Sequence, residues 1–196
     1  MALSGRRKSA AEKLDRAVNT ELKPLKLERA RFTTEIAADA DTPGPHGIDR
    51  IEFWVQTNPG TRPGPLMKIA SGGELARFLL ALKVVLADRG SAPTLIFDEV
   101  DTGVGGAVAD AIGVRLARLA RRAQVMAVTH APQVAARADR HLLITKDALD
   151  KGKRMATRVV EVAADKRREE IARMLAGAEI TAEARAAAER LIKAAE

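Results

Sequence analysis

The chain contains no cysteine and no tyrosine, and aromatic residues make up only 3% of it. The absence of cysteine excludes disulfide bonds and thiolate metal sites, which fits a reducing compartment. The shortage of aromatic rings disfavours a site that stacks the bases of single-stranded nucleic acid. No apolar run approaches the ~20 residues needed to cross a bilayer, and residues 1–8 are too polar for a secretory signal. We therefore expect a cytosolic (cytoplasmic) protein with no membrane partner.

A phosphate-binding loop of the type Gly-x-x-x-x-Gly-Lys-Ser/Thr is also missing from the sequence. Such a loop holds the β- and γ-phosphates of a nucleotide with its backbone N–H groups and its lysine. A nucleotide site that used this chain would need those groups from another polypeptide segment.

Length and charge are compatible with one basic globular unit. The chain has 196 residues, of which 46% are hydrophobic, so it can form a sizeable core. The net charge of +7 would suit a nucleic-acid partner, but the basic residues are scattered along the chain. Solvated helix faces are the favoured explanation of this pattern. Because aromatic residues are scarce, any DNA contact would be made through phosphates.

The first third of the chain predicts a helix followed by a β-hairpin. Residues 3–25 carry a thin apolar seam among charged residues, which is typical of an exposed helix. Residues 31–37 and 48–57 have the composition of strands, and the segment 41–47 between them is rich in turn residues. A helix over 74–87 follows, and its positions are mostly apolar.

Strand and helix patterns alternate in the rest of the chain, which favours a parallel sheet covered by helices. We therefore expect an α/β fold with a largely parallel sheet flanked by helices, an N-terminal β-hairpin and a helix before it. The expected strands are 94–97, 124–129, 141–145 and 154–162, and the expected helices are 107–121, 132–138, 166–176 and 182–195, the last capped by Thr181.

The sequence Ser71-Gly72-Gly73-Glu74 precedes the apolar helix and has two interpretations. Ser-x-x-Glu is a capping box, in which two side chains satisfy free backbone N–H groups at a helix start. A simple cap gains nothing from two glycines, which each destabilise a helical turn by up to ~1 kcal/mol. They are useful if a ligand must approach the backbone closely, and a helix N-terminus attracts phosphate.

Polar residues follow two of the expected strands. Asp98 and Glu99 end the apolar strand 94–97, and this position suits a hard cation at the carboxyl end of a parallel strand. We predict that Asp98 holds Mg²⁺ and that Glu99 orients or deprotonates the water that attacks a γ-phosphate. His130 follows the strand 124–129, where it could sense or hold that phosphate.

Four segments, taken in order, resemble the signature motif, Walker B, D-loop and H-loop of an ABC-type ATPase. They are Ala70–Glu74, Leu95–Glu99, Asp101 with its glycine-rich turn, and His130. Each segment alone would be weak, but four in compatible order and spacing are specific. The glutamate that ends the signature and the segment Phe97–Asp101 are similar to the SMC-like DNA-repair branch of the superfamily rather than to transporters.

This resemblance implies the C-terminal lobe of an ATPase head that uses ATP and Mg²⁺. Residues 1–27 would be the end of a coiled-coil arm, and residues 28–196 would be the lobe. The Walker A loop would come from an N-terminal head lobe, and the second head of a homodimer would complete each site. Ser71, Gly72 and Gly73 would contact the γ-phosphate held by the opposite head, and Glu74 and Asp101 would belong to the same nucleotide-contacting set.

The function implied is ATP hydrolysis by engaged heads during DNA recombination and double-strand-break repair at the bacterial nucleoid, with DNA bound by the full assembly. Without Walker A, the isolated chain should be inactive. A non-catalytic module that docks on a partner ATPase is an alternative, as is a fragment of another ABC- or SMC-family ATPase. A pure DNA-binding module would lose affinity steeply with salt and would not respond to ATP.

Overall fold

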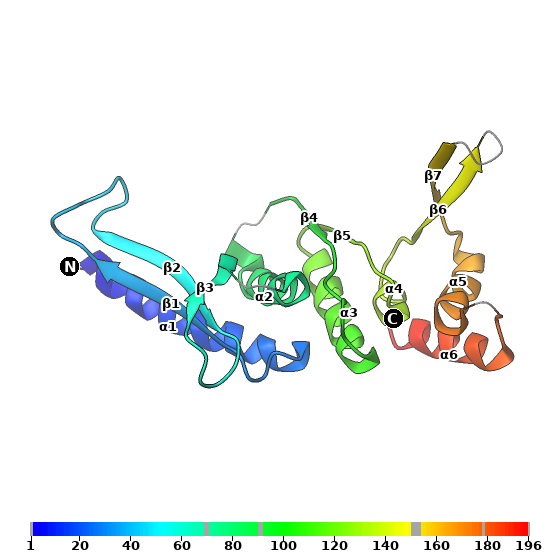
Figure 1. The fold of residues 1–196 in the computed structure, drawn as a ribbon, viewed down its shortest axis with the longest axis horizontal. Coiled ribbons are helices and arrows are strands. Elements are labelled where there is room, and N and C mark those ends of the chain that lie inside the picture. The colour runs from blue at the N-terminus through cyan, green and yellow to red at the C-terminus, as the bar shows by residue number, and fades with distance from the viewer. Residues whose placement is uncertain (1, 69–70, 90–91, 150–153, 178, 196) are drawn as a thin grey trace. The chain divides into compact units, whose positions relative to one another are not determined.

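The computed structural model describes residues 2–68, 71–89, 92–149, 154–177 and 179–195. The chain forms two compact units, Met1–Val128 and Thr129–Glu196 (Figure 1). Within the described ranges, no helix is long and apolar enough to cross a membrane.

The first unit begins with a helix that lies along a β-hairpin (Figure 1). Helix α1 (Ala2–Leu22) and the short 3-10 helix η1 (Lys23–Leu25) precede strands β1 (Arg31–Ala38) and β2 (Asp49–Gln56). The two strands are antiparallel and pair from Arg31 opposite Gln56 to Ala38 opposite Asp49. A third, two-residue strand, β3 (Gly64–Pro65), adds to β2. The predicted helix and hairpin are confirmed.

Helix α1 is attached to β1 by its apolar seam and by polar side chains. Val18 and Leu22 are fully buried. The side-chain amide of Asn19 donates to the carbonyl of Phe32 at 2.8 Å and accepts from its N–H at 2.9 Å. Asp15 accepts from both the N–H and the hydroxyl of Thr34. Because the helix satisfies backbone groups on the outer edge of β1, that edge is protected from pairing with another strand.

The second half of this unit places two helices beside a parallel strand pair. Helix α2 (Gly72–Val85) follows the 3-10 helix η2 (Leu66–Lys68), and η3 (Ala87–Arg89) leads to strand β4 (Thr94–Phe97). Helix α3 (Gly106–Ala120) connects β4 to strand β5 (Gln124–Ala127), which pairs with β4 in parallel, with Thr94 opposite Gln124. This is the strand–helix–strand unit that the alternating pattern predicted.

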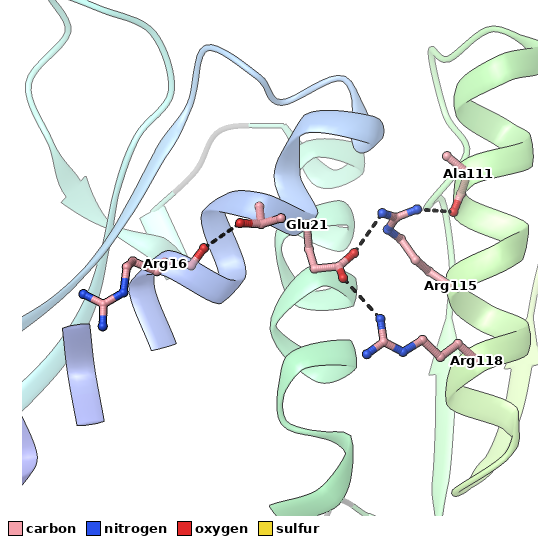
Figure 2. Close-up of polar contacts among 6 residues, drawn as sticks. Arg16, Glu21, Ala111, Arg115 and Arg118 are labelled. Carbon is pink, nitrogen blue, oxygen red and sulfur yellow. Dashed lines mark hydrogen bonds and ion pairs between the residues drawn. The ribbon is translucent and has the colours of Figure 1, made fainter. Parts of the chain in front are cut away.

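Helices α1 and α3 are joined by a charged cluster (Figure 2). Glu21 lies 2.8 Å from Nη2 of Arg115 and 3.3 Å from Nη1 of Arg118. Arg115 also donates from Nη1 to the carbonyl of Ala111 at 3.0 Å. The side chains of Glu21 and Arg115 are only 17% and 16% exposed, whereas that of Arg118 is 62% exposed. The pair between Glu21 and Arg115 therefore lies largely out of water.

The second unit consists of a short helix, a hairpin and two longer helices. Ala135, Ala136, Ile171, Ala172 and Ala188 form its buried core. The hydroxyl of Thr181 accepts from the N–H of Ala184 at 3.2 Å and caps the last helix, as predicted. The elements are α4 (Pro132–Ala135), β6 (Leu142–Leu149), β7 (Arg154–Glu161), α5 (Ala164–Ala176) and α6 (Ala182–Lys193).

The α/β class is confirmed, but the parallel part of the sheet is smaller than predicted. Among the described strands, only β4 and β5 pair in parallel. The strand expected over residues 141–145 is longer, and it pairs antiparallel with β7, from Leu142 opposite Glu161 to Leu149 opposite Arg154. The reason is chain connectivity, since a strand that follows after a short connection can form a hairpin, whereas a parallel partner needs a crossover.

The proposed boundary between an arm (residues 1–27) and a head lobe (28–196) stays a prediction. Helix α1 belongs to the same compact unit as β1–β5. Near its start, Arg7 contacts Asp49 of β2 at 2.7 Å, and this hydrogen bond holds the pKa of the Asp49 carboxyl below its usual range. Both ends of the helix therefore contact residues of the predicted lobe.

Candidate functional site

The signature segment forms the capped N-terminus of α2. The hydroxyl of Ser71 accepts from the N–H of Glu74 at 3.4 Å, and the carbonyl of Ser71 accepts from Leu75 at 3.0 Å. Gly72 and Gly73 occupy the first helical turn, with Glu74 beside them. Ala70, which belongs to the predicted motif, lies outside the described residues. The predicted cap is present, and Ser71 and Gly72 are exposed to solvent.

The two carboxylates follow directly after β4, at the carboxyl end of the parallel pair. Asp98 and Glu99 are both exposed. Asp98 Oδ1 accepts from the N–H of Glu99 at 2.9 Å, and the carbonyl of Glu99 accepts from the N–H of Thr102 at 3.1 Å. Glu99 has φ of 58°, a left-handed conformation that a non-glycine residue adopts at some cost in free energy. Two local hydrogen bonds thus accompany a strained backbone at Glu99.

The signature turn and the carboxylate turn are in direct contact. A Cβ atom added to Gly72 would lie 3.0 Å from Oε2 of Glu99. A Cβ atom added to Gly73 would lie 3.3 Å from the carbonyl oxygen of Thr102 and 3.4 Å from that of Glu99. Glycine at position 73 thus lets two backbone segments approach closely, and glycine at position 72 leaves room for the Glu99 side chain.

Arg77 is a residue of this site that the sequence did not reveal. Its side chain is on the same face of α2 as Gly73, one turn later, and a helical side chain leans back over the preceding turn. Nη1 of Arg77 donates to the carbonyl of Thr102 at 3.2 Å. The residue is only 7% exposed, and burial lowers the pKa of its guanidinium. A charged residue within an otherwise apolar helix was the available signal.

The D-loop segment leads from the carboxylates into α3. Asp101 is 2% exposed, so its carboxylate is buried in the unit. Gly103 has φ of 71°, which favours glycine, and Gly105 precedes the first turn of α3. The predicted role of Asp101 in nucleotide contact stays a prediction, as do the roles of the other site residues.

His130 belongs to the second unit, three residues beyond the end of β5 at Ala127. The residue is exposed, and it precedes Ala131, whose N–H donates to the hydroxyl of Thr129 at 3.0 Å. His130 and Glu99 thus belong to different units, and the contact of His130 with a γ-phosphate stays a prediction.

The donor set is compatible with Mg²⁺ only as part of a larger site. Within the described ranges, no group of three or more histidine and carboxylate side chains could hold a metal ion by itself. Mg²⁺ is commonly bound by one or two carboxylates together with substrate phosphates and water. Asp98 fits this pattern because it is exposed at a strand end, with Glu99 beside it.

One face of the parallel pair is apolar and uncovered. Leu95 and Phe97 point into the unit and are 9% and 8% exposed, whereas Ile96, between them, is 70% exposed. Met126, which is opposite Ile96 on β5, and Val128, just after the end of β5, are 46% and 53% exposed. A parallel strand pair normally has both faces covered. These three residues, Ile96, Met126 and Val128, are called the open face below.

In sequence, the chain is similar to bacterial proteins named DNA repair protein RecN. It is 45% identical to that of Rickettsia bellii over 190 residues, which is 97% of this chain and 34% of the relative. It is 45% identical to that of Streptomyces coelicolor over 205 residues, or 99% of this chain and 36% of the relative. The chain thus spans about a third of the length of these curated relatives. No protein-family model matches it.

In fold, the chain is similar to solved SMC head domains. One is the Smc head domain with a coiled coil and joint from Pyrococcus yayanosii, with a TM-score of 0.57 and 19% identity over 85% of this chain and 29% of that one. Another comes from work on ATP-driven dimerization and DNA-stimulated activation of SMC ATPases, with a TM-score of 0.52 and 16% identity over 89% of this chain and 99% of that one.

Proposed function

Because the chain belongs to the RecN family and has the fold of an SMC-like head, we propose that it is the C-terminal lobe of a DNA-repair ATPase. It supplies the signature, the Walker B carboxylates and the H-loop histidine to heads that engage around ATP. In the assembled protein this activity serves recombination and double-strand-break repair on DNA at the bacterial nucleoid.

One observation carries this proposal: the two exposed carboxylates end a parallel strand whose outer face is apolar and uncovered. Ligands of open α/β sheets gather at the carboxyl ends of the strands. An apolar face beside that edge favours a second protein layer, because burying it removes hydrocarbon from water. This combination is what the lobe of a divided nucleotide site requires.

The residues divide into two sets, and each set acts on a different nucleotide. Asp98 is positioned to hold Mg²⁺, which when bound supplies charge neutralisation for the phosphates. Glu99 orients or deprotonates the attacking water, and His130 holds the γ-phosphate of the same head. Ser71, with Gly72, Gly73 and Glu74, offers the positive end of α2 to the γ-phosphate of the partner head, and Asp101 supports this set.

The partner lobe that carries Walker A is the first interaction we propose. The open face is the docking surface for this lobe, and the isolated chain should bind ATP weakly or undetectably because it lacks the phosphate-holding lysine. Calorimetry with Mg-ATP measures this directly, and micromolar affinity of the chain alone would contradict the divided site.

The test of the function is reconstitution. The chain is mixed with the Walker A lobe of a RecN relative, and ATP hydrolysis is followed with and without Glu99→Gln. We expect hydrolysis only in the mixture and a fall of about 10²- to 10⁴-fold with the variant, as for loss of a general base. Hydrolysis that survives Glu99→Gln would remove Glu99 from this role. ATP-dependent association without any hydrolysis would favour the non-catalytic docking module instead.

A further inference from the structure

The two motifs that serve different nucleotides in the proposed function are packed against each other within one chain. Gly72 meets the Glu99 carboxylate, and Gly73 meets the carbonyls of Glu99 and Thr102. We call this contact region, formed by Gly72, Gly73, Arg77, Glu99 and Thr102, the signature–carboxylate junction.

Arg77 is the side chain that connects the two halves of the junction. A Cβ atom on Gly73 would lie 3.3 Å from its Nη1, so the guanidinium lies directly against the signature turn. The same Nη1 donates to the carbonyl of Thr102 in the turn after the carboxylates. One nitrogen atom thus lies against both motifs. The two residues that its hydrogen bond joins, Arg77 and Thr102, are 25 positions apart in the sequence.

The cost of this arrangement indicates that it is more than a way to fill space. Arg77 is only 7% exposed, and its Nε atom is buried with no hydrogen-bond partner. Burying a guanidinium is unfavourable, and the nearby Glu74 carboxylate opposes that cost without outweighing it, so the pKa of Arg77 is still lowered. The hydrogen bond to the Thr102 carbonyl offsets part of the cost, and it is the side-chain bond that ties Arg77 to the carboxylate turn.

We propose that Arg77 is a positioning residue that couples the signature turn to the carboxylate turn of the same head. This inference rests on the proposed function and deepens it. When the signature turn binds the phosphate of the partner head, Arg77 transmits any shift of Gly73 to Thr102 and, through the hydrogen bond from the Thr102 N–H to the Glu99 carbonyl, to Glu99. Closure of the site in one head then sets the water-activating carboxylate of the other.

The strained backbone of Glu99 is the element whose conformation this coupling would change. Its φ of 58° lies in a region that a residue other than glycine adopts only when its surroundings hold it there. Gly72 leaves space for the Glu99 carboxylate beside the positive end of α2. A phosphate that arrives at the same helix end competes with this carboxylate and favours its release toward its own nucleotide.

The first test needs no nucleotide. Hydrogen–deuterium exchange is measured on the chain with Arg77→Met and, as the matched control, with Arg115→Met, which removes another largely buried arginine of the same unit. We expect Arg77→Met to accelerate exchange in both turns, 72–77 and 99–106, by about 10-fold or more beyond any acceleration by Arg115→Met, which reaches these turns only through the stability of the whole unit. Acceleration in only one turn, or equal acceleration by both variants, would overturn the coupling.

The second test uses the reconstituted head described above. Arg77→Met should lower kcat about 10- to 100-fold, as for a misplaced catalytic group, while KM for ATP changes less than about 3-fold. Arg77→Lys keeps a donor for the Thr102 carbonyl and should recover part of this loss. A lysine variant as slow as the methionine variant, or a rise in KM with kcat unchanged, would overturn the assignment. Wild-type heads that hydrolyse no ATP would refute the proposed function, while the exchange experiment would still decide the coupling.

Discussion

Replacing Glu21 by glutamine should lower the free energy of unfolding of the first unit by about 2 kcal/mol. The substitution keeps the size of the side chain but removes the charge that faces Arg115, so the largely buried guanidinium is left with neutral acceptors only, such as the carbonyl of Ala111. Breaking a fully buried ion pair costs about 3–5 kcal/mol, and an exposed pair contributes about 0–1 kcal/mol. At 17% and 16% exposure, the pair lies between these limits.

The second partner of Glu21 should contribute little. Arg118 lies 3.3 Å from the carboxylate, but its side chain is 62% exposed and solvent screens the interaction. We therefore expect Arg118→Gln to cost less than about 0.5 kcal/mol. Arg122 and Asp88 form an exposed pair in the same unit, with 64% and 74% exposure, so Arg122→Gln is the control for loss of one surface arginine.

The single tryptophan of the chain makes the assay specific to this unit. Trp54 lies on β2, so its fluorescence during urea unfolding reports on the hairpin that α1 covers. A double-mutant cycle of Glu21→Gln with Arg115→Met isolates the pairwise term, which we expect at about 1–2 kcal/mol. If Glu21→Gln cost no more than Arg122→Gln, the reasoning from burial would be refuted.

Two further predictions concern other parts of the molecule. Burial, aided by Arg167 and Arg173 and opposed by Glu170, lowers the pKa of His141 below 6.5, so the folded second unit excludes a proton that the unfolded chain binds; stability is full above pH 6.5 and falls as the pH drops below it. Hydrogen exchange of the α5 amides across this range should show the loss, and His141→Gln should remove it; a slope that persists in the variant would contradict this cause. On the open face, Ile96→Lys should change the stability of the chain by less than about 0.5 kcal/mol yet weaken binding of the Walker A lobe, whereas Leu95→Ala should destabilise it by about 2–4 kcal/mol. Unchanged lobe binding by Ile96→Lys would remove the open face from the interface.

Much of the local structure could be predicted from sequence patterns. The strand at Thr94–Phe97 was predicted with its exact bounds, and the helix predicted over 107–121 is found at Gly106–Ala120. Ser71 and Thr181 were identified as caps because a helix start is recognised by residues within one turn of it. The partner of β6 could not be predicted in this way, because which strands pair depends on contacts between segments that are separated along the chain.

The candidate site shows the same division. Asp98 and Glu99 were located at a strand end by the apolar run before them, and the structure places them there. The burial of Asp101 and Arg77 had no local signature, because burial depends on what the rest of the chain packs against a residue. Arg77 appeared in the sequence only as a charged interruption of an apolar helix.

The sequence alone determined the helices, the strands and the order of the four ATPase-like motifs, because hydrophobic period, capping residues and motif spacing are properties of neighbouring residues. Only the tertiary structure decided that the signature glycines touch the carboxylate turn, that Arg77 joins them, and that Glu21 meets an arginine cluster up to 97 positions away. Such contacts depend on which distant segments the packed core brings together, and this depends on the burial of the whole unit rather than on any stretch of residues within it.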